Sequence, residues 1–212
     1  MKIFNPDSKF MRAMNRLADM MLLNLCFLLT CVPIFTVGAS LTALYTVSFR
    51  LDTPKEGHNL RDYFVAFKQN FKQSTIVWLL FALSGGALFF DWHMFSSMQG
   101  KGSLVSILIL VLMGIWLIVF SLTFPLLSRF ENSTGQTLKN ALVLGIAYLP
   151  RCLLMAAVNL LPFVLLFRDL YMFLYTGFLW IALYFSAAAY FNAKMMKKIL
   201  RNFEDDEEEE DE

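Results

Sequence analysis

The 212-residue chain contains little charge, since Asp, Glu, Lys and Arg make up 17% of it and hydrophobic residues 58%. Two long stretches, residues 103–128 and 170–193, contain no Asp, Glu, Lys, Arg or His. A soluble domain carries more charge and divides its apolar residues into short periodic groups. A membrane-spanning helix needs about 20 consecutive apolar residues, and both stretches are long enough. The composition therefore excludes a soluble globular domain and predicts an integral membrane protein.

The sequence also lacks the motifs of the common enzyme classes. It has no Walker A glycine loop, no GxSxG or HExxH motif and no dinucleotide-binding glycine fingerprint. The two histidines, His58 and His93, are predicted in loops on opposite sides of the membrane, where they cannot share a metal ion. The three cysteines form no CxxC pair and are typical of small buried apolar side chains. We expect no enzymatic activity, cofactor, metal ion or nucleic acid partner.

The basic residues are concentrated in a few places. Sixteen of the eighteen Lys and Arg residues fall in four clusters, and only Lys101 and Arg168 lie outside them. The clusters are residues 2–16, 50–72, 129–151 and 194–201. Cytoplasmic loops carry an excess of Lys and Arg, so all four clusters are expected on the cytoplasmic side. This arrangement predicts that both termini are cytoplasmic.

If both flanks of residues 17–50 are cytoplasmic, this segment must enter the membrane and return. As one helix it would be about 51 Å long, well beyond the roughly 30 Å of the hydrocarbon core. Pro33 cannot donate a backbone hydrogen bond and Gly38 permits a turn, while the Thr36 hydroxyl can satisfy freed backbone groups. We predict a broken or re-entrant helical hairpin with a structural turn at Pro33, Thr36 and Gly38. The alternative is one long, kinked and strongly tilted helix.

The rest of the chain shows a weak internal repeat. The segments FFDWHMF (89–95) and FRDLYMF (167–173) align with an offset of 78 residues, although chance similarity between apolar segments is an alternative. An amphipathic segment and an apolar run precede each copy. We therefore predict an all-α polytopic membrane domain over residues 1–203. After the hairpin, residues 59–128 and 136–203 each contribute an amphipathic surface helix and two transmembrane helices.

The first surface helix carries aromatic and basic residues in a helical pattern. A basic amphipathic helix is typical of the interface with anionic lipid, but aromatic side chains are also typical anchors at protein contacts. The second interpretation makes this helix a docking surface for a membrane partner. Its candidate docking residues are Phe64, Phe67, Lys68, Asn70 and Phe71.

The end of the chain is strongly acidic. Residues 204–212 read EDDEEEEDE and contain nine of the seventeen Asp and Glu residues. A run of like charges repels itself and cannot bury apolar surface. We expect this tail to be disordered and solvated.

Three segments carry a resemblance to a known family. They are Asn24…Pro33-x-x-Thr36-x-Gly38-Ala39…Ala43-Leu44, then Phe64-x-x-Phe67-Lys68-x-Asn70-Phe71, and Thr137-Leu138-Lys139-Asn140-Ala141. With these residues the chain resembles the YesL family of bacterial integral membrane proteins, a domain of unknown function. The resemblance implies a multi-pass protein of the bacterial cytoplasmic membrane with a link to carbohydrate uptake.

Two classes of function follow from these expectations. In the first, the protein is a non-catalytic accessory or regulatory subunit that contacts lipids and the permease subunits of a carbohydrate ABC importer. In the second, the repeated units form a small transporter or channel. An ion or proton pathway would need ionisable groups at mid-membrane depth, and the sequence places none there. A membrane regulator coupled to a sensor kinase is a further alternative.

Overall fold

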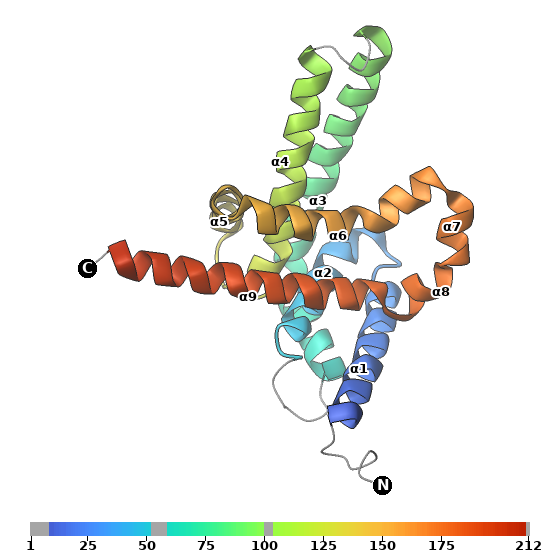
Figure 1. Cartoon of the computed structure of the whole chain (residues 1–212), viewed down its shortest axis with the longest axis vertical. Helices are drawn as coiled ribbons and strands as arrows, with labels where there is room; N and C mark the ends of the chain where they lie inside the picture. The colour runs from blue at the N-terminus through green and yellow to red at the C-terminus, as the bar shows by residue number, and fades with distance from the viewer. Residues whose placement is uncertain (1–8, 52–58, 100–103, 211–212) are drawn as a thin grey trace.

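The computed structural model describes residues 9–51, 59–99 and 104–210, and these residues fold into helices joined by short connections (Figure 1). Within these ranges, four helices are long and apolar enough to cross a membrane. They are α1 (Lys9–Thr30), α3 (Asn59–Gln99), α4 (Leu104–Leu127) and α6 (Leu149–Arg168). No strand occurs in the described ranges. The predicted all-α polytopic membrane fold is therefore confirmed.

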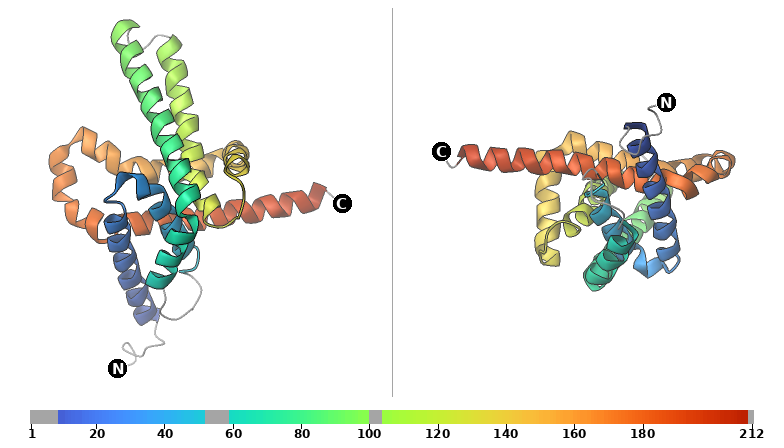
Figure 2. Two further views of the ribbon diagram at one scale, coloured as in Figure 1. Left: turned by 180° about the vertical axis from the view of Figure 1, so that it is seen from behind. Right: turned by 90° about the horizontal axis from the view of Figure 1, so that it is seen from below.

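Residues 9–48 form two separate helices rather than one kinked helix. Helix α1 ends at Thr30, a short 3₁₀ helix η1 spans Ile34–Thr36, and α2 spans Val37–Ser48. The chain turns back after α1, so that α2 runs toward the centre of the molecule (Figures 1 and 2). Nine of the twelve residues of α2 are buried. This short helix is therefore enclosed by protein, as backbone interruptions inside a membrane require.

Helix α3 differs from the expected repeat unit, because the surface helix and the first span are one continuous helix of 41 residues. Residues 59–99 contain no proline, so nothing removes a backbone donor or forces a break. In the second unit, α5 (Thr134–Ala147) and α6 are separate. Tyr148, with φ −119° and ψ 40°, lies between them, and Pro150 follows in the first turn of α6. The two units therefore differ at the junction of surface helix and span.

Residues 170–193 also differ from the expectation, since they do not form one straight span. They comprise α7 (Leu170–Tyr175), α8 (Gly177–Leu179), the π-helix η2 (Trp180–Tyr184) and the start of α9 (Phe185–Glu210). Asp169 ends α6 and caps α7 by accepting from the backbone amides of Tyr171 and Met172. The Thr176 hydroxyl donates to the Met172 carbonyl. These side-chain contacts stabilise the bent path between α6 and α9 (Figure 1).

The acidic end of the chain is a further departure from the sequence-based expectation. Helix α9 continues to Glu210, so it includes most of the segment 204–212 that was expected to be disordered. Glutamate is a good helix former, and a helix that is already nucleated extends more easily than a new one forms. Residues 211–212 lie outside the described residues.

Two apolar clusters hold the helices together. The first joins α1, α2, α3, α4 and the start of α9, and its largest fully buried side chains include Tyr63, Phe124 and Leu23. The second joins α4, α5, α6 and α9 around Met155 and Met196. Helix α4 therefore packs in both clusters, whereas the distal half of the α3–α4 hairpin projects beyond the other helices (Figure 1).

Candidate functional site: turn, exposed aromatic stripe and intramembrane cavity

The turn after α1 contains the predicted Pro33 and Thr36. Pro33 has extended backbone angles of φ −76° and ψ 113° and precedes the 3₁₀ helix. The buried Thr36 hydroxyl donates to the carbonyl oxygens of Thr30 (2.5 Å) and Pro33 (2.6 Å). The Ser40 hydroxyl donates to the Thr36 carbonyl at 3.0 Å. Hydroxyl groups thus bond carbonyls at the end of α1 and the start of α2.

Gly38 has a different role from the predicted one, because it lies inside α2 rather than at the turn. A Cβ atom added at Gly38 would overlap the Ser74 carbonyl oxygen and lie 2.6 Å from the Trp78 Cβ atom of α3. Beside this contact, the hydroxyls of Thr42 and Ser74 are 2.8 Å apart. Gly38 therefore allows α2 and α3 to approach closely, as small residues do between membrane helices.

The five candidate docking residues do not share one environment. Phe64 and Phe71 are 46% and 37% exposed, and Lys68 between them is exposed. Phe67 is half-buried against the first apolar cluster, with its ring 5.5 Å from that of Phe71. The Asn70 side chain donates to the Ala66 carbonyl of its own helix. The exposed part is thus a stripe of Phe64, Lys68 and Phe71, which we name the aromatic stripe.

The opposite face of this part of α3 is buried in the protein. Tyr63, Ala66, Ser74 and Val77 are each less than 4% exposed. The Tyr63 hydroxyl is 2.6 Å from that of Thr30, near the end of α1. Because the buried face fixes the rotation of α3, the aromatic stripe points outward.

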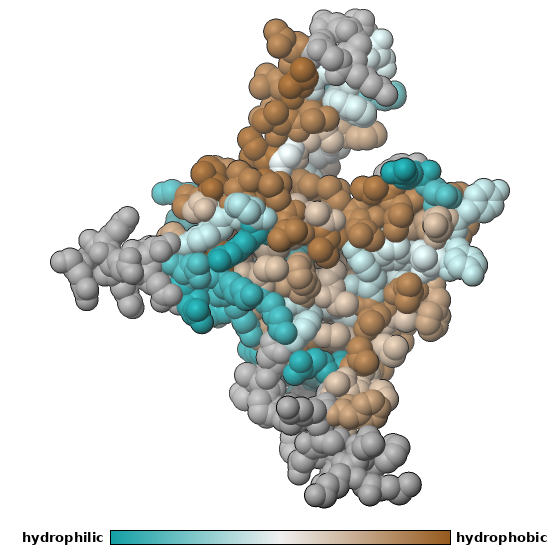
Figure 3. Space-filling view, in the orientation of Figure 1, coloured by the Kyte–Doolittle hydropathy of each residue, from teal (hydrophilic) through white to brown (hydrophobic). Residues whose placement is uncertain are grey.

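Residues of three of the basic clusters meet around α9, at a surface that we name the basic end. Arg16 of α1 donates to the Tyr190 hydroxyl of α9 and lies over its ring, where Lys194 also lies. Arg129 lies over the Phe49 ring, and Arg151 donates to the Lys198 carbonyl of α9. Hydrophilic side chains gather over the middle of α9, whereas hydrophobic side chains cover α4 and α6 (Figure 3). Residues far apart in sequence thus form one basic end.

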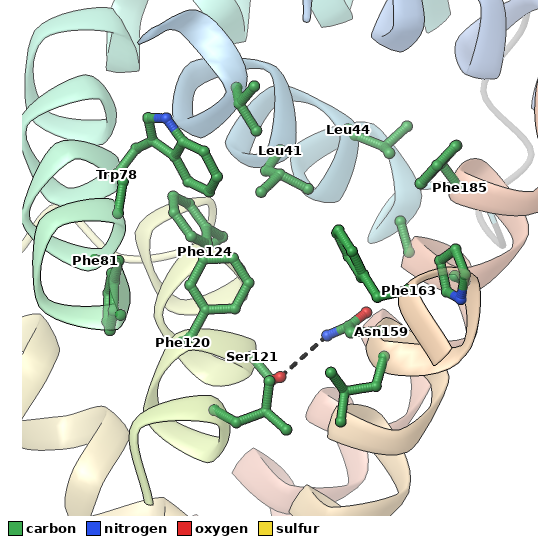
Figure 4. A pocket seen from close by; sticks show the side chains of 18 of the residues that line it. Leu41, Leu44, Trp78, Phe81, Phe120, Ser121, Phe124, Asn159, Phe163 and Phe185 are labelled. Atoms are coloured by element: carbon green, nitrogen blue, oxygen red, sulfur yellow. Dashed lines mark hydrogen bonds between the residues drawn. The ribbon is translucent and has the colours of Figure 1, made fainter. Parts of the chain in front are cut away.

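A cavity of about 420 Å³ lies between α2, α3, α4, α6 and the start of α9. Most of its lining is apolar, and aromatic rings dominate it (Figure 4). The rings of Trp116 and Phe120 stack with centroids 5.3 Å apart, and Phe81 packs edge-on against Phe120. Ala82, Gly86 and Phe163 contribute to the lining and are exposed at the surface of the spans. The cavity is therefore accessible from the apolar surface of α3 and α6.

Polar side chains form a cluster at one side of this cavity. Asn159 of α6 donates to the Ser121 hydroxyl of α4 at 3.1 Å (Figure 4). Asn192 of α9 donates to Asn159 Oδ1 at 2.8 Å and to the Tyr45 hydroxyl of α2 at 3.1 Å. Asn192 is fully buried, and its Oδ1 atom has no hydrogen-bond partner among the described residues. Four helices thus meet at one buried polar cluster, which we name the Asn159 cluster.

The cavity wall beside this cluster depends on two departures from regular helix. Pro162 lacks the backbone N–H that would bond the Val158 carbonyl, and the Tyr184 hydroxyl donates to that carbonyl instead, at 2.5 Å. Tyr184 is the last residue of the π-helix, a form that is frequent at functional sites. Pro162 and Tyr184 both line the cavity.

A buried amide of α1 holds the π-helix from the other side. Asn24 donates to the carbonyl oxygens of Trp180 (3.0 Å) and Ile181 (2.6 Å) and accepts from the Ser186 amide (3.1 Å). A π-helix leaves backbone groups without their usual partners, and a fully buried asparagine supplies them here. Asn24 is also the first residue of the segment that resembles the YesL family.

Sequence reasoning missed the Asn159 cluster. Asn159 and Asn192 interrupt apolar segments, and polar side chains within spans commonly bond neighbouring helices, so a signal was present. Their hydrogen-bond partners could not be predicted from the sequence, because Tyr45 and Asn192, for example, are 147 positions apart. No three His, Cys, Asp or Glu side chains gather into a metal-binding group in the described ranges. His58 lies outside them, and His93 is exposed near the end of α3.

Comparison with known protein families finds a match within the first half of the chain. Residues 20–92 match the family described as "Protein of unknown function, DUF624". The match covers about a third of the chain and includes the end of α1, the turn, α2 and most of α3. None of the curated proteins and none of the solved structures matches the chain.

Proposed function

We propose that this protein belongs to the YesL family and is a non-catalytic accessory or regulatory subunit of a carbohydrate ABC importer. The observation that carries the proposal is the aromatic stripe of α3, where Phe64 and Phe71 are exposed beside Lys68. The stripe lies inside the segment that matches the DUF624 family. The link to carbohydrate uptake comes from the resemblance to the YesL family.

The chemistry of the stripe favours a protein partner over lipid alone. Leucine would satisfy lipid contacts equally well, whereas aromatic side chains are concentrated at the energetically important positions of protein interfaces. Lys68 adds a positive charge that can pair with an acidic group of the partner. The permease subunits of the importer are the membrane partner that the family resemblance implies.

We also propose that the basic end faces the cytoplasm of a bacterial cell, with both termini on that side. Residues of three basic clusters meet there, since Arg16 lies over the Tyr190 ring of α9 and Arg151 donates to the Lys198 carbonyl. An excess of Lys and Arg is characteristic of cytoplasmic segments. This orientation places the aromatic stripe near the cytoplasmic boundary, where the chain can contact the inner parts of a permease.

A small transporter is the second candidate, and the cavity is the observation that favours it. Within the described part of the chain, its lining residues include no Asp, Glu, Lys, Arg or His. A sugar presents many hydroxyl groups, each of which needs a hydrogen-bond partner when it leaves water. The lining offers few polar groups beyond Tyr45, Ser121, Asn159 and Tyr184, so the cavity suits a sugar poorly. The accessory role is therefore the better supported function.

Co-purification in a mild detergent tests this role. The protein is expressed with the carbohydrate importer of its own host, and the permease subunits recovered with it are quantified. The double variant Phe64→Leu/Phe71→Leu keeps the stripe apolar but changes its shape, so it is expected to reach the membrane and lose the permease. The matched control Phe89→Leu/Phe90→Leu changes two exposed phenylalanines further along α3 and is expected to retain it. Equal recovery with both variants would refute docking through the stripe.

A further inference from the structure

The cavity has the dimensions and position of a ligand site within the spans. Its volume of about 420 Å³ falls in the range of about 300–1,000 Å³ that is typical of small-molecule sites. Lining residues of α3, α4 and α6 belong to the apolar windows of these helices. Because exposed span residues such as Phe163 form part of the lining, a ligand reaches the cavity from the hydrocarbon phase.

The Asn159 cluster gives this cavity a polar anchor. Ser121 and Tyr45 are 3% and 4% exposed and both line the cavity, as does Asn159. Buried polar atoms in native proteins are almost always hydrogen-bonded, yet Asn192 Oδ1 has no partner among the described residues. Asn192 is not one of the lining residues, so a ligand in the cavity meets the cluster at the Tyr45, Ser121 and Asn159 side chains.

We propose that the cavity binds a single-chain amphiphile, with its alkyl chain between the aromatic rings and a neutral hydroxyl group at the Asn159 cluster. Aromatic and aliphatic side chains on all sides suit an alkyl chain. The hydroxyl group can donate to the cluster as well as accept from it, whereas an ester or ketone carbonyl only accepts.

The absence of charge in the lining decides the class of head group. Among the residues that the structure describes, the lining contains no Lys, Arg or His that would neutralise a carboxylate or phosphate, and no Asp or Glu that would pair with an amine. Moving an unpaired charge out of water is very costly. The ligand is therefore an uncharged long-chain alcohol or a lipid of that chemistry, and a fatty acid or phospholipid head group is disfavoured.

Tryptophan quenching locates the ligand, because Trp116 lines the cavity and Trp92 does not. Two variants of the full chain keep only one tryptophan each, at position 116 or 92, with phenylalanine at the other three positions. Each is placed in phosphatidylcholine nanodiscs and titrated with a 16-carbon alcohol brominated in mid-chain. Quenching of Trp116 is expected to saturate at a low mole fraction, while quenching of Trp92 rises linearly. Parallel curves for both would overturn the proposal.

The head-group preference is tested with two further probes of the same length. A brominated alkane and a brominated fatty acid at pH 8 are both expected to quench Trp116 with lower apparent affinity than the alcohol. Replacing Asn159 with leucine removes hydrogen bonds of the cluster. This change is expected to lower the apparent affinity for the alcohol about fivefold, without changing the apparent affinity for the alkane. The control Asn70→Leu removes an amide that donates to the Ala66 carbonyl of its own helix. It is expected to change neither the affinity for the alcohol nor that for the alkane.

Equal affinity of the wild-type protein for all three probes would refute the polar anchor, as would an unchanged response to the alcohol in the Asn159→Leu variant. The ligand site does not rest on the accessory role. The measurement uses the purified protein without an importer, so its failure leaves the co-purification result untouched, and the reverse also holds.

Discussion

The Tyr184 hydroxyl donates to the Val158 carbonyl at 2.5 Å, across the gap between η2 and α6. This carbonyl lacks its usual helical donor because Pro162 stands four residues later. The carbonyl that the proline leaves without a helical donor thus accepts a hydrogen bond from a side chain of another irregular segment. The same principle applies at the turn after α1, where Thr36 bonds two carbonyls, and at η2 itself, where Asn24 bonds the backbone.

The Tyr184–Val158 bond predicts a coupling that a double-mutant cycle can measure. Tyr184→Phe leaves the Val158 carbonyl without a donor and is expected to lower the free energy of unfolding by about 1–2 kcal/mol. In a Pro162→Ala background, the restored backbone amide at position 162 can bond the Val158 carbonyl. There, Tyr184→Phe is expected to lower the free energy of unfolding by well under about 1 kcal/mol. Thermal or denaturant unfolding in detergent provides the values. Equal costs in both backgrounds would mean that the hydroxyl does not replace the missing helical bond.

The close contact at Gly38 predicts that Gly38→Ala and Gly114→Ala differ in stability. The Cβ atom of Gly38→Ala would overlap the Ser74 carbonyl, so α2 and α3 must separate at a cost of roughly 1–3 kcal/mol. Gly114 provides the matched control, since a Cβ atom there meets nothing within 4 Å. Gly114→Ala is expected to be neutral or to stabilise the helix by up to about 1 kcal/mol. Similar unfolding midpoints for the two variants would contradict the close approach of α2 and α3.

The proposed orientation predicts which positions are accessible from outside the cell. In a background without Cys26, Cys31 and Cys152, a cysteine at position 97 near the end of α3 should react with an impermeant maleimide on intact cells. A cysteine at position 135, at the start of α5, should react only after the membrane is opened. Position 135 offers a suitable site because a side chain there meets nothing within 4 Å. The reverse labelling pattern would invert the topology.

The parts of the fold that the sequence predicted depend on local pattern. The uncharged run 103–128 predicted the span α4, and Pro33 predicted the break after α1, because both effects act within a few residues. The uncharged run 170–193 was wrongly predicted as a span, since it is divided among α7, α8, η2 and α9. The continuity of α3 was missed, since the amphipathic pattern of residues 59–72 suggested a separate surface helix. Helix continuity depends on the absence of a breaker between the two parts, and the second unit differs because it contains Pro150.

Less of the candidate site than of the fold could be predicted from the sequence, because the site depends on tertiary packing. Phe64, Phe67 and Phe71 follow one another at the spacings of three and four that place residues on one helix face, yet Phe67 packs against the core. Only the rotation of α3, which the burial of Tyr63 fixes, separates these environments. The cavity and the Asn159 cluster bring together side chains from α1, α2, α3, α4, α6, η2 and α9, and no local spacing encodes that meeting.

Site-specific photocrosslinking tests the central proposal, docking of the aromatic stripe on an importer permease, most directly. A photoreactive phenylalanine analogue replaces Phe64 in cells that express the importer, and the crosslinked products are identified by mass spectrometry. Phe90, which is 65% exposed on the distal half of α3, provides the control position. The account predicts a crosslink from position 64 to a permease subunit and none from position 90. Crosslinks from position 64 to lipid alone, or to the permease equally from both positions, would contradict it.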